Sequence, residues 1–277
     1  MPIRVAFVFL FMLSLSACSS GSEDDAVSCT GSCTAPESEV VPEKTTRTIA
    51  ASGGGLSGGL TSATYEPRSG TFTVRAPGLN AQMNRFSSAD YRGFLAMRDA
   101  AGIHNAYLAQ GQGTQVVVYS GGTAGNVRNI AGYERTGASE LPLNGTARFD
   151  GDYAGFTSTR RINGKVQLDV DFSASKMSGR ITDRVFRQRP DNVVDTVNPL
   201  STLFLEETKL NGNGSFRGVT GGGQITNGQI LWNPATGDFS GLIGGANGDE
   251  AVGTVAVTHR APSGATFDEI GGFLATR

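Results

Sequence analysis

Lys165-Val-Gln-Leu-Asp-Val-Asp-Phe-Ser173 alternates apolar and polar residues along its length. Successive side chains of a β-strand point to opposite faces, so this alternation separates an apolar face from a polar one. The apolar face holds Val166, Leu168, Val170 and Phe172. Such a pattern predicts a half-buried strand. Residues 145–155 repeat it, with Ala147, Phe149 and Tyr153 on the apolar face, and predict a second strand of the same kind.

Turn-forming residues separate further short apolar segments. Asn-Gly pairs favour tight turns because both residues tolerate positive φ. Turns are therefore predicted at Asn163-Gly164, Asn211–Gly214, Asn227-Gly228 and Asn247-Gly248, and another tight loop at Asn233-Pro-Ala-Thr-Gly237. The strands predicted between such turns cover 145–155, 165–173, 177–184, 202–210, 214–219, 223–232, 238–244 and 250–258, and a ninth at 269–276 could close the sheet.

A flat sheet with this many strands would leave long edges exposed, and closure removes them. The predicted outward faces carry Asp, Gln, Lys and Arg. A membrane-spanning barrel needs an outward apolar band with aromatic girdles instead. We therefore predict an all-β chain whose main domain is a soluble, antiparallel, up-and-down, eight-stranded β-barrel.

The region before the barrel is less regular. Residues 59–65, 71–75 and 114–119 read as strands. They predict a small β-rich N-terminal subdomain over residues 48–140, packed on a barrel domain of residues 141–277. The alternative is that these strands belong to the same sheet as the barrel.

The first residues are typical of an export signal. Arg4 precedes an apolar run, Val5–Leu15, which is about half as long as a membrane-spanning helix requires. Leu15-Ser16-Ala17-Cys18 resembles the bacterial lipobox, in which the cysteine is lipidated and becomes the mature N-terminus. We predict a signal peptide over residues 1–17 and a lipid on Cys18. Ser19, rather than Asp, favours the outer membrane. An ordinary signal peptide with an incidental cysteine is the alternative.

The segment after the leader, residues 18–47, is rich in Ser, Gly, Glu, Asp, Thr and Pro. Such a composition predicts a lipidated, disordered tether. Cys29 and Cys33 lie in it and could form a disulfide in an oxidising compartment, or remain ordinary thiols. Two cysteines without a neighbouring histidine fall short of a zinc site. The formal net charge of −2 gives no electrostatic footprint for nucleic acid.

Several short motifs resemble those of transferrin-binding-protein-B-like lipoproteins, in the same order. They are Leu141–Gly155, Leu168–Phe172 followed by Ser178-Gly179, Phe216–Gly218, Gly237–Gly241, Ala251–Thr254 and Gly271–Ala275. The resemblance implies a surface lipoprotein with an eight-stranded barrel and a handle-like β subdomain. Relatives of this type, including factor-H-binding lipoproteins, bind macromolecules or haem. The large transferrin binders have two lobes and this chain has room for one barrel, so transferrin binding is not implied.

Few residues point to a metal, a cofactor or catalysis. His104 and His259 are the only histidines, and neither has a second ligand type nearby in sequence. Tyr119 and Tyr133 could ligate haem, although an aromatic residue on a strand usually packs. Adjacent Glu206 and Glu207 point to opposite faces. Asp169 and Asp171 share the outer, solvated face. We expect no metal site and no enzyme activity, with haem as the one cofactor left open.

One long connection stands out. Residues 184–200 join two predicted strands at much more than hairpin length, and such loops are often functional. Arginine and aromatic residues are enriched at binding hot spots. The candidate binding residues of this loop are Arg184, Phe186, Arg187 and Arg189. The alternative is a tolerated surface excursion.

Three functions are consistent with these features. The first is a non-catalytic binding module on the cell surface, which recognises a protein or small ligand, with iron or haem acquisition as one such role. The second is a periplasm-facing carrier of a small apolar ligand such as haem, and the third is an envelope-structural lipoprotein. The row from Val166 to Phe172 predicts a filled barrel, because eight strands enclose just enough space for side chains. That favours recognition at the surface.

Overall fold

The computed structural model describes residues 47–50, 59–123, 126–188, 194–195, 200–221, 233–260 and 264–277. All of them belong to one compact unit, residues 42–277. They form β-strands joined by turns, with a single 3-10 helix among the described residues, at Ser87–Ala89. Within the described part of the chain, no helix is long and apolar enough to span a membrane. Cys18, Cys29, Cys33 and Arg189 lie outside the described residues.

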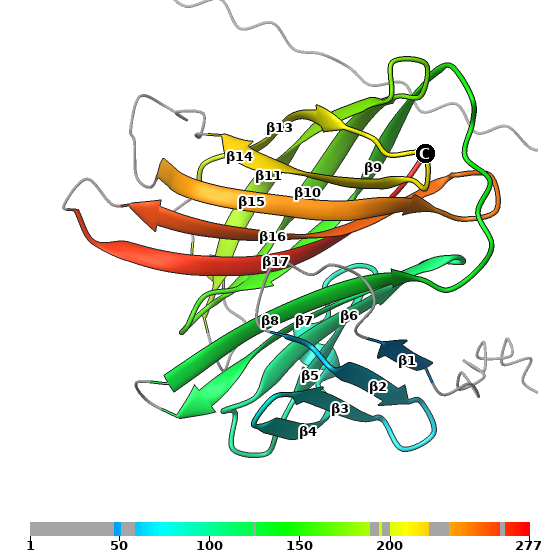
Figure 1. Cartoon of the computed structure of the whole chain (residues 1–277). Helices are drawn as coiled ribbons and strands as arrows, with labels where there is room; N and C mark the ends of the chain where they lie inside the picture. The colour runs from blue at the N-terminus through cyan, green and yellow to red at the C-terminus, as the bar shows by residue number, and fades with distance from the viewer. Residues whose placement is uncertain are drawn as a thin grey trace, which may run out of the picture. The chain divides into compact units, whose positions relative to one another are not determined.

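The first sheet has eight antiparallel strands, each paired with its neighbours in sequence (Figure 1). They are β1 (Arg47–Ala50), β2 (Ser62–Glu66), β3 (Thr71–Ala76), β4 (Leu79–Arg85), β5 (Phe94–Arg98), β6 (Asn105–Gln110), β7 (Thr114–Thr123) and β8 (Asn126–Arg135). The predicted N-terminal strands therefore form a sheet of their own, and the alternative of one common sheet is wrong.

The second sheet closes on itself as an up-and-down barrel. Its strands are β9 (Thr146–Phe156), β10 (Arg161–Asp171), β11 (Lys176–Arg187), β13 (Leu203–Lys209), β14 (Ser215–Gly221), β15 (Asn233–Gly244), β16 (Glu250–Arg260) and β17 (Thr266–Thr276). β9 pairs with both β10 and β17, and β10 pairs with both β9 and β11. A short β12 (Val194–Asp195) adds to the end of β11. The predicted eight-stranded antiparallel barrel is confirmed.

Two of the predicted turns are confirmed and two are wrong. Asn211–Gly214 and Asn247-Gly248 form turns, and Gly214 and Gly248 adopt the positive φ that favours glycine there. Asn163-Gly164 is not a turn, because both residues lie inside β10 and pair with Ala154 and Tyr153 of β9. The chain reverses before them, where the Thr157 hydroxyl accepts the Thr159 and Arg160 amides.

The remaining two turn predictions fall near β15. Asn233–Gly237 belongs to that strand and not to a loop, because its backbone continues the ladder with β16. In both failed cases a strand partner overrides the local preference for a turn. Asn227-Gly228 and the strand predicted at 223–232 lie outside the described residues.

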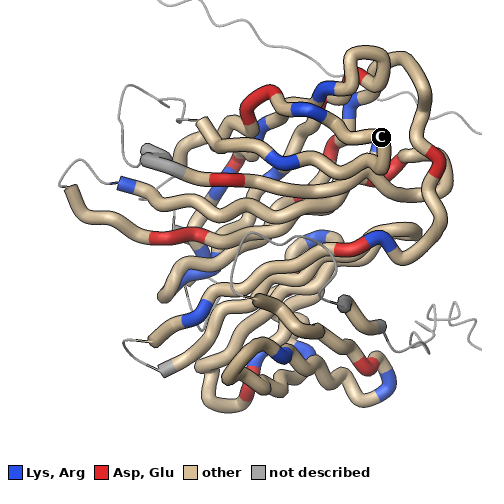
Figure 2. Tube along the Cα trace, in the orientation of Figure 1, with Lys and Arg blue, Asp and Glu red and all other residues tan. Residues whose placement is uncertain are grey.

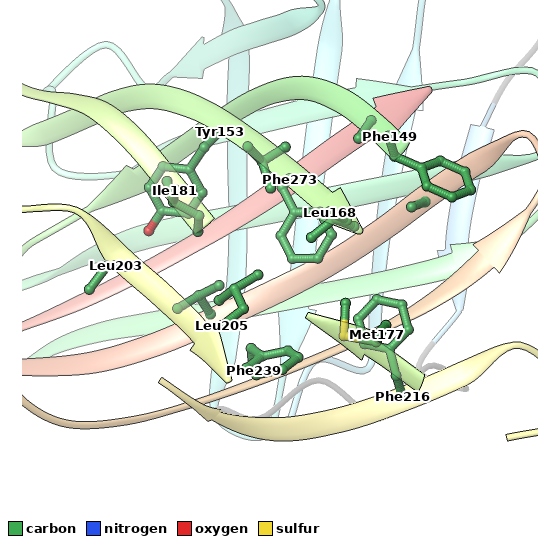
Figure 3. Close-up of a cluster of buried hydrophobic side chains, with 14 of the residues drawn as sticks. Phe149, Tyr153, Leu168, Met177, Ile181, Leu203, Leu205, Phe216, Phe239 and Phe273 are labelled. Carbon is green, nitrogen blue, oxygen red and sulfur yellow. The ribbon is translucent and has the colours of Figure 1, made fainter. Parts of the chain in front are cut away.

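Apolar side chains fill the barrel interior (Figure 3). The row Val166, Leu168, Val170 and Phe172 is buried there, as its alternation predicts. Other strands of the barrel add large side chains that point toward the same centre, including Phe149, Phe216, Phe239 and Phe273. Burying side chains of this size stabilises a fold by about 1.5–3 kcal/mol each.

A second apolar layer joins the barrel to the first sheet. Tyr107 of β6 stacks on Phe156 of β9, with ring centroids 5.1 Å apart. Gly272 of β17 lies against Val116 and Val118, where a Cβ atom would collide with their methyl groups. One buried carboxylate also bridges the two sheets: Glu250 of β16 accepts the Gln112 amide at 2.5 Å and the Thr114 hydroxyl at 2.7 Å.

Candidate functional site

The first residues of the predicted binding loop belong to a strand, and the expected surface exposure of Arg184 and Phe186 is wrong. Arg184, Phe186 and Arg187 lie in β11. Arg184 and Phe186 are buried, and Arg187 is half-buried. The cause is a β-bulge at Asp183, which has φ 51°, and which inserts one extra residue against β10. Met177 and Ile181 point into the barrel, and side chains alternate along a strand. Without the bulge, Arg184 would therefore point outward.

Inside the barrel, Arg184 joins a buried polar cluster around Glu269. The Arg184 guanidinium forms an ion pair with the Glu269 carboxylate, and both side chains have no exposed area. His259 Nε2 lies 2.7 Å from Glu269 Oε2, and the Tyr153 hydroxyl donates to Glu269 Oε1 at 2.5 Å. Arg184 also donates to the Ser201 carbonyl at 2.6 Å. We call these four side chains, Tyr153, Arg184, His259 and Glu269, the Glu269 cluster.

The cluster controls the ionisation of its own members. Burial by itself would raise the pKa of Glu269, but Arg184, His259 and Tyr153 outweigh burial and lower this pKa to about 2. Burial and the adjacent Glu269 carboxylate raise the pKa of Tyr153 well above its usual value. Glu269 is therefore an anion and Tyr153 a neutral donor at neutral pH. With no exposed area on Arg184, His259 or Glu269, the cluster supports the barrel and does not face a partner.

Sequence reasoning did not find this cluster, although β17 carries a signal for it. Phe267, Gly271, Phe273 and Ala275 share the inward parity of that strand, and Glu269 occupies the same parity. A charged residue on an apolar face needs a buried partner. The partners come from β9, β11 and β16, so only barrel closure brings them together.

The outer surface of β9, β10 and β11 presents a ladder of charged and uncharged polar side chains that we call the charged wall. It consists of Arg148, Asp150, Asp152, Lys165, Gln167, Asp169, Ser178, Arg180 and Thr182. Arg148 Nε donates to Asp169 Oδ1 at 2.9 Å, and Arg180 donates to Gln167 Oε1 at 2.6 Å. Basic and acidic positions are interspersed over both sheets (Figure 2).

Two hollows lie on the charged wall. One, of about 650 Å³, is lined by wall residues and by the exposed Lys176–Glu207 pair, whose atoms lie 2.6 Å apart. The other, of about 530 Å³, includes Arg92, which reaches over from the first sheet and lies 3.3 Å from Asp152. Burial raises the pKa of Asp152, although Arg92 and Lys165 act in the opposite direction. The charged wall therefore has concave, charged surface to which a partner can bind, whereas the barrel interior is filled with side chains.

The histidine and tyrosines considered as haem or metal ligands pack within the structure, whereas Asp169 does not. His104 Nδ1 lies 2.6 Å from the Tyr119 hydroxyl, and burial raises the pKa of Tyr119 to about 12. Tyr133 is buried between the sheets. Asp169 is exposed on the outer face, as expected. Among the described residues, no group of three or more His, Cys, Asp or Glu side chains could hold a metal ion.

No protein-family model matches the chain, and the search of curated proteins found no match. Solved structures of transferrin-binding protein B, the family that the barrel motifs resemble, are similar. A mutant of that protein from Haemophilus parasuis Hp5 is 16% identical, with a TM-score of 0.44 over 74% of this chain and 40% of the other. The isotype 1 protein from serogroup B Neisseria meningitidis is 13% identical, with a TM-score of 0.43 over 84% and 43%.

A third similar structure has no assigned role. It is a protein of unknown function from the DUF3598 family of Nostoc punctiforme, 9% identical with a TM-score of 0.27 over 84% of this chain and 93% of the other. This chain spans about two fifths of the length of the transferrin-binding proteins with which it aligns.

Proposed function

We propose that the protein is a non-catalytic binding module, held on the outer membrane by a lipid on Cys18, that recognises its partner through the charged wall. The observation that carries this proposal is the contrast between the two sides of the barrel. Large apolar side chains occupy the inside, whereas the outside of β9–β11 holds two hollows among charged residues. We therefore expect a ligand to bind to the outer surface of the barrel, at the charged wall.

The chemistry of the wall suits a partner with mixed charge. Its side chains already pair with one another, as in Arg148–Asp169 and Gln167–Asp150. Charges held in fixed positions select a partner by complementarity and speed its association, and they reject partners of the wrong pattern. A macromolecular surface with its own alternating charges matches this arrangement.

The anchor predicts the location of the protein. Changing Cys18 to alanine should move the protein from the membrane fraction to the soluble fraction, because no acyl chain then holds it. Immunoblots of fractionated cells measure this change, with Cys29→Ala as the matched control that should remain on membranes. Added protease should digest the anchored barrel on intact cells. Membrane retention of the Cys18→Ala protein contradicts the anchor, and protection until the envelope is broken contradicts surface display.

The wall itself is tested by photo-cross-linking on intact cells. A p-benzoylphenylalanine in place of Ser178, which lines the larger hollow, should give a discrete adduct, and one in place of Thr73 on the first sheet should not. Arg180→Glu should lower the yield of that adduct about tenfold, since like charges across an interface are unfavourable. Arg75→Glu, an equally exposed change on β3, should leave the yield unchanged. Equal yields from both sites, or no effect of Arg180→Glu, contradict the proposal.

A further inference from the structure

Two arginines, Arg98 and Arg161, lie against the same aromatic ring where the first sheet covers the start of β10. Ile162 and Gly164 face the barrel interior, so Arg161 and Asn163 point outward. Arg161 is nevertheless only 1% exposed. Its Nη2 donates to Asn105 Oδ1 of β6 at 2.8 Å. Arg98 of β5 is the direct cross-strand partner of Asn105.

An aromatic ring joins the pair. The Cζ atoms of Arg98 and Arg161 lie 5.2 Å and 5.5 Å from the centroid of the Phe86 ring. Asn105 Nδ2 donates to the Gly102 carbonyl at 3.1 Å, which orients Asn105 Oδ1 toward Arg161. Arg161 forms the buried floor of this arrangement, and Arg98 is half-buried at its rim.

No described carboxylate balances the positive charge of Arg98 and Arg161. Among the described residues, no Asp or Glu forms an ion pair with Arg98 or Arg161. Arg161 Nη1 is buried without a hydrogen-bond partner, and so are both amide atoms of Asn163. An arginine is always protonated in proteins, so its burial without a counter-ion is costly. Burial and the nearby Arg98 lower the pKa of Arg161, while Tyr107 opposes them.

The group that such a cluster lacks is an anion with two or more oxygens. A guanidinium presents a planar fork of donors that matches carboxylate and phosphate oxygens. We propose that Arg161 and Arg98, positioned by Asn105, bind a small oxyanion, a carboxylate or phosphate group, at the junction of the two sheets. This site is separate from the charged wall and does not depend on the function proposed for it.

The test measures anion binding by the intact purified lipoprotein in detergent. Sodium phosphate and sodium acetate are titrated at low millimolar concentration against sodium chloride of equal ionic strength, by calorimetry and by thermal unfolding. A ligand that binds only the folded state raises the unfolding temperature. We expect phosphate or acetate, but not chloride, to do so. The salt that acts identifies the oxyanion class.

Variants locate the site. Arg161→Gln should weaken oxyanion binding about tenfold or more, as expected for loss of a charge-assisted hydrogen bond. Arg75→Gln removes an exposed arginine of β3, outside both proposed binding sites, and should leave binding within about twofold of the wild type. If Arg161→Gln does not fold, Arg98→Gln at the rim takes its place, with the same expected loss. The proposal is overturned if neither oxyanion differs from chloride, or if Arg75→Gln weakens binding as much as Arg161→Gln or Arg98→Gln does.

Discussion

Replacing Glu269 with alanine is expected to lower the free energy of unfolding by about 3–5 kcal/mol, as when one partner of a buried ion pair is removed. The change would leave the Arg184 guanidinium buried without its carboxylate, and the Tyr153 hydroxyl without its acceptor. Urea unfolding followed by circular dichroism measures the loss. Glu207→Ala is the matched control, because the Lys176–Glu207 pair is more than half exposed and should contribute less than about 1 kcal/mol.

A double variant separates the ion pair from the rest of the cluster. Arg184→Leu together with Glu269→Leu removes both buried charges, so it should be less destabilising than the sum of the single changes. A Glu269→Ala protein within about 1 kcal/mol of the wild type would contradict the buried pair. Additive losses in the double variant would show that Arg184 and Glu269 do not interact.

The Glu269 cluster also makes the stability of the barrel depend on pH. The pKa of Glu269 falls from its ordinary 4.5 to about 2 on folding, so its contribution is fully present above pH 4.5. It is lost as the pH falls through 2, because the folded protein must then take up a proton that the unfolded chain already holds. The stability advantage of the wild type over Glu269→Gln should therefore narrow by about 3 kcal/mol across that window, at 1.36 kcal/mol for each pKa unit.

Phe273→Ala is expected to lower the free energy of unfolding by about 3–5 kcal/mol, the usual cost of removing a buried phenylalanine. Phe273 is fully buried and lies at the centre of the packed interior among Leu168, Phe239 and Tyr153 (Figure 3). A loss of that size lowers the unfolding temperature by about 10 °C in a domain of this length. Scanning calorimetry measures the shift. Leu143→Ala, at a side chain that is 93% exposed, should change it little.

The same variant also tests whether the barrel is filled. An apolar cavity left by a truncated core residue stays dry and can bind benzene. Benzene should therefore raise the unfolding temperature of Phe273→Ala and leave that of the wild type unchanged. Stabilisation of the wild type to the same extent would mean that the barrel already has space for a small apolar ligand, and would favour the carrier function.

Much of the fold could be predicted because strands follow local alternation. Residues 165–173 and 145–155 were placed in the right strands by the period of their apolar residues alone. The closed, eight-stranded form followed from the number of strands and the cost of open edges. The turns at Asn211–Gly214 and Asn247-Gly248 followed from residues that tolerate positive φ.

The candidate sites were beyond this kind of reasoning. Asp183 inserts one residue into β11, and that single insertion turns Arg184 from the surface into the barrel. Alternation cannot foresee a bulge, because a bulge depends on the partner strand. The charged wall and the two-arginine cluster likewise depend on cross-strand register, which sets Arg148 beside Asp169 and Arg98 beside Asn105.

The sequence by itself determined the all-β class, the strands at residues 145–155 and 165–173, and the apolar row from Val166 to Phe172, because alternation is a property of neighbours along the chain. Only the tertiary structure decided that Asn163-Gly164 stays within a strand and that Glu269 meets Arg184 and His259. It alone covers Arg161 with the first sheet. The physical reason is that pairing register and barrel closure bring together residues far apart in sequence, and the burial that results sets their charge and their partners.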